Sequence, residues 1–166
     1  QGVDVMAFQF EGVDATGIDL SGMDLRGKTF VGTILNDSKL VKVQAAGVNF
    51  DRAHLIGADL TSAHLEGASF VSSKLERANF SLAMASEAVF THVEGEKSIW
   101  NGARLSGVQF VDADLVESSW KHAVADSAEF VNSDLSGATF VDADLSYGHW
   151  EGTVAVDAIF ESCLLY

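Results

Sequence analysis

Residues 103–120 read ARLSGVQFVDADLVESSW and place a large apolar side chain at every fifth position: Leu105, Phe110, Leu115 and Trp120. On an α-helix a step of five residues turns a side chain through about 140°, so these residues would spiral around the helix and form no apolar stripe. On a flat strand the same odd step places successive large residues on opposite faces. The spacing therefore predicts a chain that bends once in every repeat and returns each large residue to the inside.

The same spacing runs along the whole chain. Between Val5 and Leu165 there are 33 positions divisible by five, and they hold 13 Leu, 10 Phe, 3 Trp, 5 Ala, 1 Val and 1 Gly. None of these central positions is charged. The position two residues before each centre is a second apolar class, mostly small, and Lys28 is its one charged member. Because the frame never slips, the sequence predicts one repeat domain over residues 1–166, without a linker.

A four-sided coil would use four repeats, or twenty residues, and would stack every twentieth side chain. One such column consists only of aromatic residues: Phe10, Phe30, Phe50, Phe70, Phe90, Phe110, Phe130 and Trp150. We expect these side chains to form a ladder of offset-stacked rings in the core. About eight coils, spaced like neighbouring strands, would make a rod about 40 Å long.

Several repeats also carry a recognisable motif. Residues 58–62, 78–80, 113–115 and 143–146 read ADLTS, ANF, ADL and ADLS. These segments resemble the A(D/N)LXX motif of the pentapeptide-repeat family, and the resemblance covers the whole chain in frame. It implies an all-β fold, a right-handed quadrilateral β-helix with four pentapeptides in each coil.

Composition limits the functional classes. The 24 acidic and 10 basic residues give a formal net charge of -14, which argues against direct nucleic-acid binding, since that requires clustered Lys and Arg. No apolar run approaches the eighteen or so residues of a membrane span, and no signal peptide is visible. A chain that begins with Gln1 is expected to lack an upstream piece. The compartment stays open: cytoplasmic, or lumenal or periplasmic if a signal was removed.

The residues that usually carry chemistry are scattered. Cys163 is the single cysteine, so no thiolate metal cage is expected. The histidines lack the twenty-residue spacing that would stack them, although Glu129 and His149 have it and could pair. GxSxG, HExxH, GxxxxGK and GxGxxG are all absent. A filled core also leaves no substrate cavity. The sequence therefore predicts no enzyme, no catalytic residue, no cofactor and no metal.

The acidic residues have a clearer distribution. Residues 105–166 hold 11 acidic residues and one basic residue, Lys121. The candidate binding face consists of one column with a twenty-residue spacing and three flanking residues: Glu94, Asp114 and Asp134, with Glu96, Asp112 and Glu117. Stacked like charges are destabilising. Two interpretations stay open: a family preference for Asp before each centre, or a face that binds a basic protein or partly imitates the phosphates of DNA.

Residues 91–98 depart most from the motif, because Gly95 occupies a centre. One interpretation is room for the large rings of Phe90 and Trp100, since interiors are close-packed. The other is a bulged wall that presents Glu94, Glu96 and Lys97 to a partner.

Repeat rods commonly present extended binding surfaces. The first functional prediction is a non-enzymatic scaffold for protein–protein interaction. An alternative is an acidic DNA mimic that binds a type II topoisomerase (gyrase), as the gyrase-protecting members of the family do. Unlike those members, this chain ends inside the repeat and has no projecting loop. A further alternative is the substrate-binding part of a larger bacterial effector. The apolar terminal coil, which includes Leu164, Leu165 and Tyr166, predicts a homodimer, most simply a two-fold one.

Overall fold

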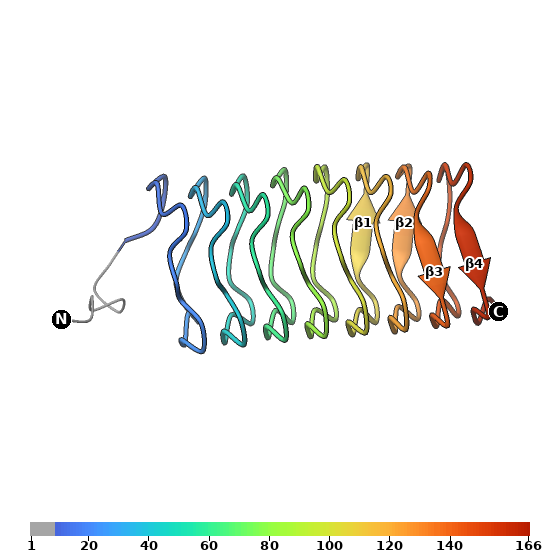
Figure 1. The fold of residues 1–166 in the computed structure, drawn as a ribbon, viewed down its shortest axis with the longest axis horizontal. Helices are drawn as coiled ribbons and strands as arrows, with labels where there is room; N and C mark the ends of the chain where they lie inside the picture. The colour runs from blue at the N-terminus through green and yellow to red at the C-terminus, as the bar shows by residue number, and fades with distance from the viewer. Residues whose placement is uncertain (1–8) are drawn as a thin grey trace.

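The computed structural model describes residues 9–166. The described chain winds into coils of similar size that stack along one axis and follow one another in sequence order from one end of the rod to the other (Figure 1). Parallel pairing joins residues twenty apart, from Asp14 with Ile34 to Asp144 with Leu164. Since each coil uses twenty residues and turns four corners, the fold is the right-handed quadrilateral β-helix that the resemblance implies.

Four short strands are long enough to be drawn as arrows in Figure 1. They are β1 (Gln109–Val111), β2 (Glu129–Val131), β3 (Thr139–Val141) and β4 (Ile159–Glu161). Strand β1 pairs with β2 and β3 pairs with β4, both in parallel. Elsewhere the same pairing continues through single residues, because the chain turns a corner after every five residues. No helix within residues 9–166 has the length and apolarity that crossing a bilayer requires.

Most corners are tight turns that begin at a central residue. The carbonyl of Leu75 accepts a hydrogen bond from the N–H of Ala78 at 2.9 Å, and Arg77 between them has a φ of 57°. A positive φ at this position is typical of a type II turn and is free of strain only for glycine. This explains why glycine often stands two residues after a centre, as at Gly27, where φ is 74°.

The Asp or Asn before a centre also has a structural role. In such repeats, the N–H of the residue two positions after the Asp or Asn has no carbonyl acceptor in the backbone ladder. The side-chain oxygen of the Asp or Asn accepts a hydrogen bond from this N–H. Asp14 Oδ1 accepts the N–H of Thr16 at 3.0 Å, and Asn79 Oδ1 accepts that of Ser81 at the same distance. This Asx turn explains the polar position of the A(D/N)LXX motif.

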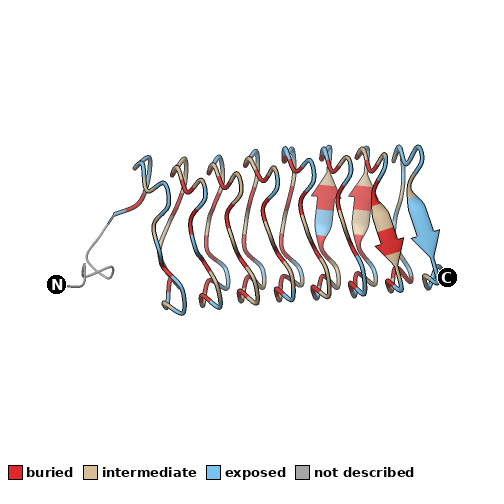
Figure 2. Ribbon diagram, in the orientation of Figure 1, coloured by how far each residue is buried: buried red, intermediate tan, exposed pale blue. Residues whose placement is uncertain are grey.

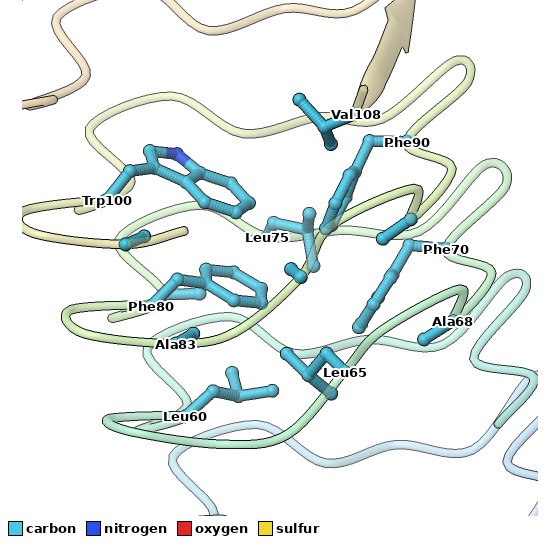
Figure 3. Close-up of a cluster of buried hydrophobic side chains, with 14 of the residues drawn as sticks. Leu60, Leu65, Ala68, Phe70, Leu75, Phe80, Ala83, Phe90, Trp100 and Val108 are labelled. Atoms are coloured by element: carbon cyan, nitrogen blue, oxygen red, sulfur yellow. The ribbon is translucent and has the colours of Figure 1, made fainter. Parts of the chain in front are cut away.

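The core contains two columns of rings. In the column from Phe10 to Trp150, successive ring centroids lie 4.5–5.4 Å apart in stacked geometry. In the facing column, Phe80, Trp100, Trp120, Phe140 and Phe160 stack at 4.1–5.5 Å. The two columns meet edge to face, as Phe90 and Trp100 do at 5.1 Å and 86° (Figure 3). Offset stacks and perpendicular contacts are the arrangements that aromatic quadrupoles favour.

Two of the three tryptophans are held by a serine that the sequence analysis did not single out. The Nε1–H of Trp100 donates to Ser98 Oγ at 2.8 Å, and that of Trp120 donates to Ser118 Oγ at 2.7 Å. Each serine stands two residues before its tryptophan and is buried. The signal that could have found them is the Ser-x-Trp spacing, which occurs at both sites.

The surroundings of Gly95 leave little room for a side chain. A Cβ at this position would lie 3.0 Å from Leu115 Cδ2, 3.2 Å from the Asp114 carbonyl oxygen and 3.5 Å from Ser98 Oγ. The glycine therefore makes room for the next coil, and the interpretation that it also makes room for Phe90 and Trp100 stays a prediction. The pairing of Lys74 with Glu94 and of Glu94 with Asp114 is uninterrupted, so the wall is not bulged here.

Candidate interaction surface

The six acidic residues singled out in the sequence lie on one wall of the rod. Glu94, Asp114 and Asp134 are successive partners in one ladder along the middle of this wall. Glu96 lies beside them, and Asp112 and Glu117 occupy the two flanking corners, with φ of 51° and 57°. We name these six residues the acidic wall. With Lys97, which lies among them, they give a formal net charge of -5.

Three members of the acidic wall contact a side chain twenty positions earlier, two of them in ion pairs with lysine and one beside a histidine. Glu94 Oε2 lies 3.3 Å from Lys74 Nζ, and Glu117 Oε2 lies 3.6 Å from Lys97 Nζ. Asp112 Oδ2 lies 3.6 Å from His92 Nδ1. All of these side chains are substantially exposed, so each pair is expected to contribute only about 0–1 kcal/mol. These contacts were not predicted from the sequence, although the twenty-residue spacing of Lys74 and Glu94 is a signal for one of them.

The other three members have no cationic partner among the described ion pairs. Two of them form Asx turns: Asp114 Oδ1 accepts the N–H of Val116 at 3.2 Å, and Asp134 Oδ1 accepts that of Ser136 at 2.9 Å. The aspartates before the centre therefore have a structural role in the turn, and they also leave the wall with an excess of negative charge. Asparagine could supply the same turn without the charge, as Asn79 does.

Replacing Asp114 separates these two roles. We expect Asp114→Asn to keep the Asx turn and to raise the free energy of unfolding by a few tenths of a kcal/mol, because it removes repulsion from Glu94 and Asp134. Asp114→Ala loses the turn as well and should be destabilising by about 0.5–2 kcal/mol, like the loss of a cap. Urea unfolding at low and high NaCl measures both changes.

Salt provides the control for this experiment. Exposed charges are screened within about 8 Å at physiological ionic strength. The unmodified chain should therefore gain stability as NaCl is added, and Asp114→Asn should show a smaller gain. Destabilisation by Asp114→Asn would mean that the carboxylate makes a required interaction and that repulsion along the column is negligible.

The histidines also form surface pairs. Glu129 and His149 are partners in the ladder, as their twenty-residue spacing predicts. The side chain of His149 nevertheless lies beside Glu151, with 3.4 Å between Nε2 and Oε2. His122 Nδ1 similarly lies 3.6 Å from Asp142 Oδ2. Within residues 9–166, no three His, Cys, Asp or Glu side chains converge as a metal site would require.

One hollow lies at the C-terminal end of the rod. Its volume is about 220 Å³, and it is lined by Leu145, Gly148, Trp150, Leu165 and Tyr166. This lining contains no carboxylate, histidine or cysteine. Nearby, the half-buried Cys163 donates its thiol hydrogen to the Phe140 carbonyl at 2.8 Å.

Comparison with known families agrees with the coil geometry. The model for pentapeptide repeats matches residues 46–81, 63–94 and 103–140, more than half of the chain, with eight copies. The chain belongs to the pentapeptide-repeat family. Proteins of this family generally have structural and binding roles. No curated protein is similar enough to count as a relative of this chain.

Solved structures of other pentapeptide-repeat proteins are similar over most of the chain. Full-length QnrB1, a plasmid-mediated fluoroquinolone resistance protein, is 20% identical with a TM-score of 0.48, covering 93% of this chain and 92% of its own. HetL, involved in heterocyst differentiation regulation in the cyanobacterium Nostoc, is 21% identical with a TM-score of 0.32, covering 94% and 88%. A protein from the Arabidopsis thaliana thylakoid lumen is 27% identical with a TM-score of 0.21, covering 74% and 68%.

Proposed function

We propose that this pentapeptide-repeat protein is a non-enzymatic scaffold that binds a basic partner protein on its acidic wall. The observation that carries the proposal is a group of three carboxylates on successive coils, Glu96, Asp114 and Asp134, without cationic partners among the described ion pairs. The ladder fixes the backbone spacing of Asp114 and Asp134, and Glu96 lies in the turn two residues after Glu94, the ladder partner of Asp114. A surface that is already ordered loses little entropy when it binds.

The charge of the wall suits recognition of a basic surface. Complementary charges steer a partner to the correct face and exclude like-charged competitors. Because all six carboxylates are at the surface, the expected contribution is mainly to the association rate and to specificity. Binding should therefore weaken steeply with added salt.

A binding experiment with matched variants tests the proposal. The wall variant carries Glu96→Gln, Asp114→Asn and Asp134→Asn. The control carries Glu87→Gln, Asp59→Asn and Asp144→Asn, which remove the same charge from other walls, and Asp59 and Asp144 form the same Asx turns. A protein retained from a lysate of the source organism should bind the wall variant at least about tenfold more weakly, a loss of about 1.4 kcal/mol, and bind the control unchanged. Equal binding to both variants would contradict the proposal.

A second candidate function is the DNA mimic that binds a type II topoisomerase, and the charge density of the wall favours it. The wall carries a net charge of -5 on three coils that span about 10 Å at the spacing of neighbouring strands. Duplex DNA carries about six phosphate charges over the same length. In a gyrase supercoiling assay, the unmodified chain should inhibit or protect the enzyme and the wall variant should not. If the unmodified chain and the wall variant gave the same result, the topoisomerase function would be excluded and the scaffold function would remain.

Two further predictions from the sequence concern the larger assembly. The length of the gene tests whether this chain is the substrate-binding part of a larger bacterial effector. Sedimentation at high salt tests whether two copies associate through their terminal coils.

A further inference from the structure

The wall opposite the acidic wall carries exposed apolar side chains. Residues ten apart lie on opposite walls of a four-sided coil, so the ladder of Met84, Arg104 and Val124 faces away from the acidic ladder. Between residues 9 and 146, the large apolar side chains that are exposed are Leu82, at 59%, and Val124, at 40%. Leu82 lies at the corner where this wall begins. Both exposed apolar residues in this part of the rod therefore belong to one wall.

These side chains form a continuous surface over three coils. Leu82 extends along the rod, because a Cβ at Gly102, one coil later, would lie only 2.8 Å from Leu82 Cδ2. Met84 is half-buried, and Arg104 lies between it and Val124 in the ladder. The methylene stem of an arginine can continue an apolar surface while its guanidinium stays in water. We name Leu82, Met84 and Val124 the apolar patch; contiguous patches of this kind mark binding sites, whereas single exposed apolar residues do not.

Two exposed cations accompany the apolar patch. Arg104 and Lys121 take part in none of the ion pairs described within residues 9–166. The backbone of Lys121 is fixed, since its N–H donates to Asn101 Oδ1 at 2.9 Å. The acidic residues on this wall of the same three coils, Glu87 and Asp126, lie at its other corner. The side of the wall that carries Leu82 is therefore apolar and positively charged, in a chain with a net charge of -14.

We propose that the apolar patch, together with Arg104 and Lys121, binds an acidic amphipathic helix of a partner protein. Leu82 and Val124 are two coils apart, which is about 10 Å along the rod at the spacing of neighbouring strands. Two turns of an α-helix advance about 11 Å, so apolar residues seven apart on the helix reach both ends of the patch. An acidic residue between them then faces Arg104. An extended segment repeats its side chains about every 6.7 Å on one face and fits this spacing less well.

Charge separates this partner from two others that an apolar surface attracts. A basic helix is repelled by Arg104 and Lys121. An anionic membrane would attract the two cations, but it is an extended surface and meets the net charge of -14 as well. A single helix contacts only these three coils, and charges farther away than about 8 Å are screened at physiological ionic strength. The balance of charge therefore favours the acidic helix.

The position of the patch leaves the acidic wall free. Because the two surfaces lie on opposite walls, a helix bound here does not cover Asp114 or Asp134. The rod can then hold two partners of opposite charge at the same time. The inference itself does not depend on the acidic wall or on its partner, since the two surfaces share no residue.

A titration of the full, ¹⁵N-labelled chain tests the proposal by NMR. The probe is a capped synthetic peptide of leucine, glutamate and alanine, with leucines three and four residues apart so that one helical face is apolar. We expect amide shifts to concentrate in residues 81–87, 101–107 and 121–127. A matched peptide with glutamine in place of glutamate should bind more weakly, although the chain as a whole repels it less. Equal binding of the two peptides, or shifts spread over all four walls, would overturn the proposal.

Matched variants assign the contact to the patch. Leu82→Ser with Val124→Thr should weaken binding of the glutamate peptide at least about tenfold, because it removes the exposed apolar groups. Val89→Thr with Val131→Thr makes the same kind of change on another wall and should leave binding unchanged. Serine and threonine already occur at equivalent positions of other repeats, and melting curves check that both variants fold. Equal binding to the two variants would contradict the proposal.

Two further measurements test the charge of the partner. Arg104→Gln should weaken binding of the glutamate peptide about threefold, as expected for an exposed ion pair, and should not affect binding of the glutamine peptide. Vesicles with and without phosphatidylserine test the membrane alternative, and we expect the chain to sediment with neither. Sedimentation with the anionic vesicles that is lost in the Leu82→Ser and Val124→Thr variant would overturn the proposal in favour of a lipid surface.

Discussion

Phe110→Ala is expected to lower the free energy of unfolding by about 3–5 kcal/mol, the usual cost of removing a buried ring. The ring of Phe110 is fully buried. It stacks between Phe90 at 4.8 Å and Phe130 at 5.4 Å, and it meets Trp100 and Trp120 edge to face, both at 5.3 Å. Five rings in register leave little freedom for the neighbours to collapse into the vacated space. Chemical denaturation of the two proteins measures the difference.

Leu82→Ala is the control for this substitution. Leu82 is also a large apolar residue, but it lies at a corner and is 59% exposed. Its truncation should change the stability by no more than about 0.5 kcal/mol. A melting temperature that is unaffected by Phe110→Ala would refute the assignment of the multiples of five to the core.

Ser118→Ala is expected to have the second largest effect, a loss of about 1–3 kcal/mol. Ser118 Oγ accepts the indole N–H of Trp120 at 2.7 Å and donates to the Leu115 carbonyl at 2.6 Å. Trp120 is fully buried, so the substitution leaves its N–H without an acceptor and without access to water. The cost comes from the orphaned donor, since alanine fits the space and is common at the equivalent position of other repeats.

Two further variants isolate that hydrogen bond. Ser38 is buried at the equivalent position, but its Oγ has no hydrogen-bond partner within residues 9–166. The central residue two positions later is Leu40, and not a tryptophan. Ser38→Ala should therefore be neutral or stabilising. In the Ser118→Ala background, Trp120→Phe should restore part of the loss, because it removes the unpaired donor. Equal destabilisation by Ser38→Ala and Ser118→Ala would show that the serines act through packing alone.

Most of the fold could be predicted from the period of five, because this period is a constraint on packing and is visible along the whole sequence. Only a chain that turns a corner in each repeat can bury Leu105, Phe110 and Leu115 together. The twenty-residue column of rings then indicated four walls. Gly95 was harder to interpret, since two of the three atoms nearest to the position of a Cβ belong to Leu115 and Asp114, on the next coil, and their distance from Gly95 depends on three-dimensional packing.

The candidate surface was only partly predictable. The spacing of Glu94, Asp114 and Asp134 placed them on one wall, because stacking follows directly from the period. Their partners did not follow. The ion pair between Lys74 and Glu94 depends on side-chain conformations, and the Asx turn of Asp114 depends on which backbone N–H the ladder leaves unpaired. Charge alone therefore overstated how much of the wall is free to bind a partner.

The direction of the ladder bonds has a mechanical consequence. These bonds join residues twenty apart and lie along the rod, so a force that pulls the two ends apart acts on one coil interface at a time. The force needed to unfold the rod is then the force that breaks a single coil interface, whatever the length of the rod, and the coils detach one after another. Each coil that detaches releases twenty residues, or about 70 Å of extended chain. Under tension the rod is therefore expected to yield stepwise, one coil at a time.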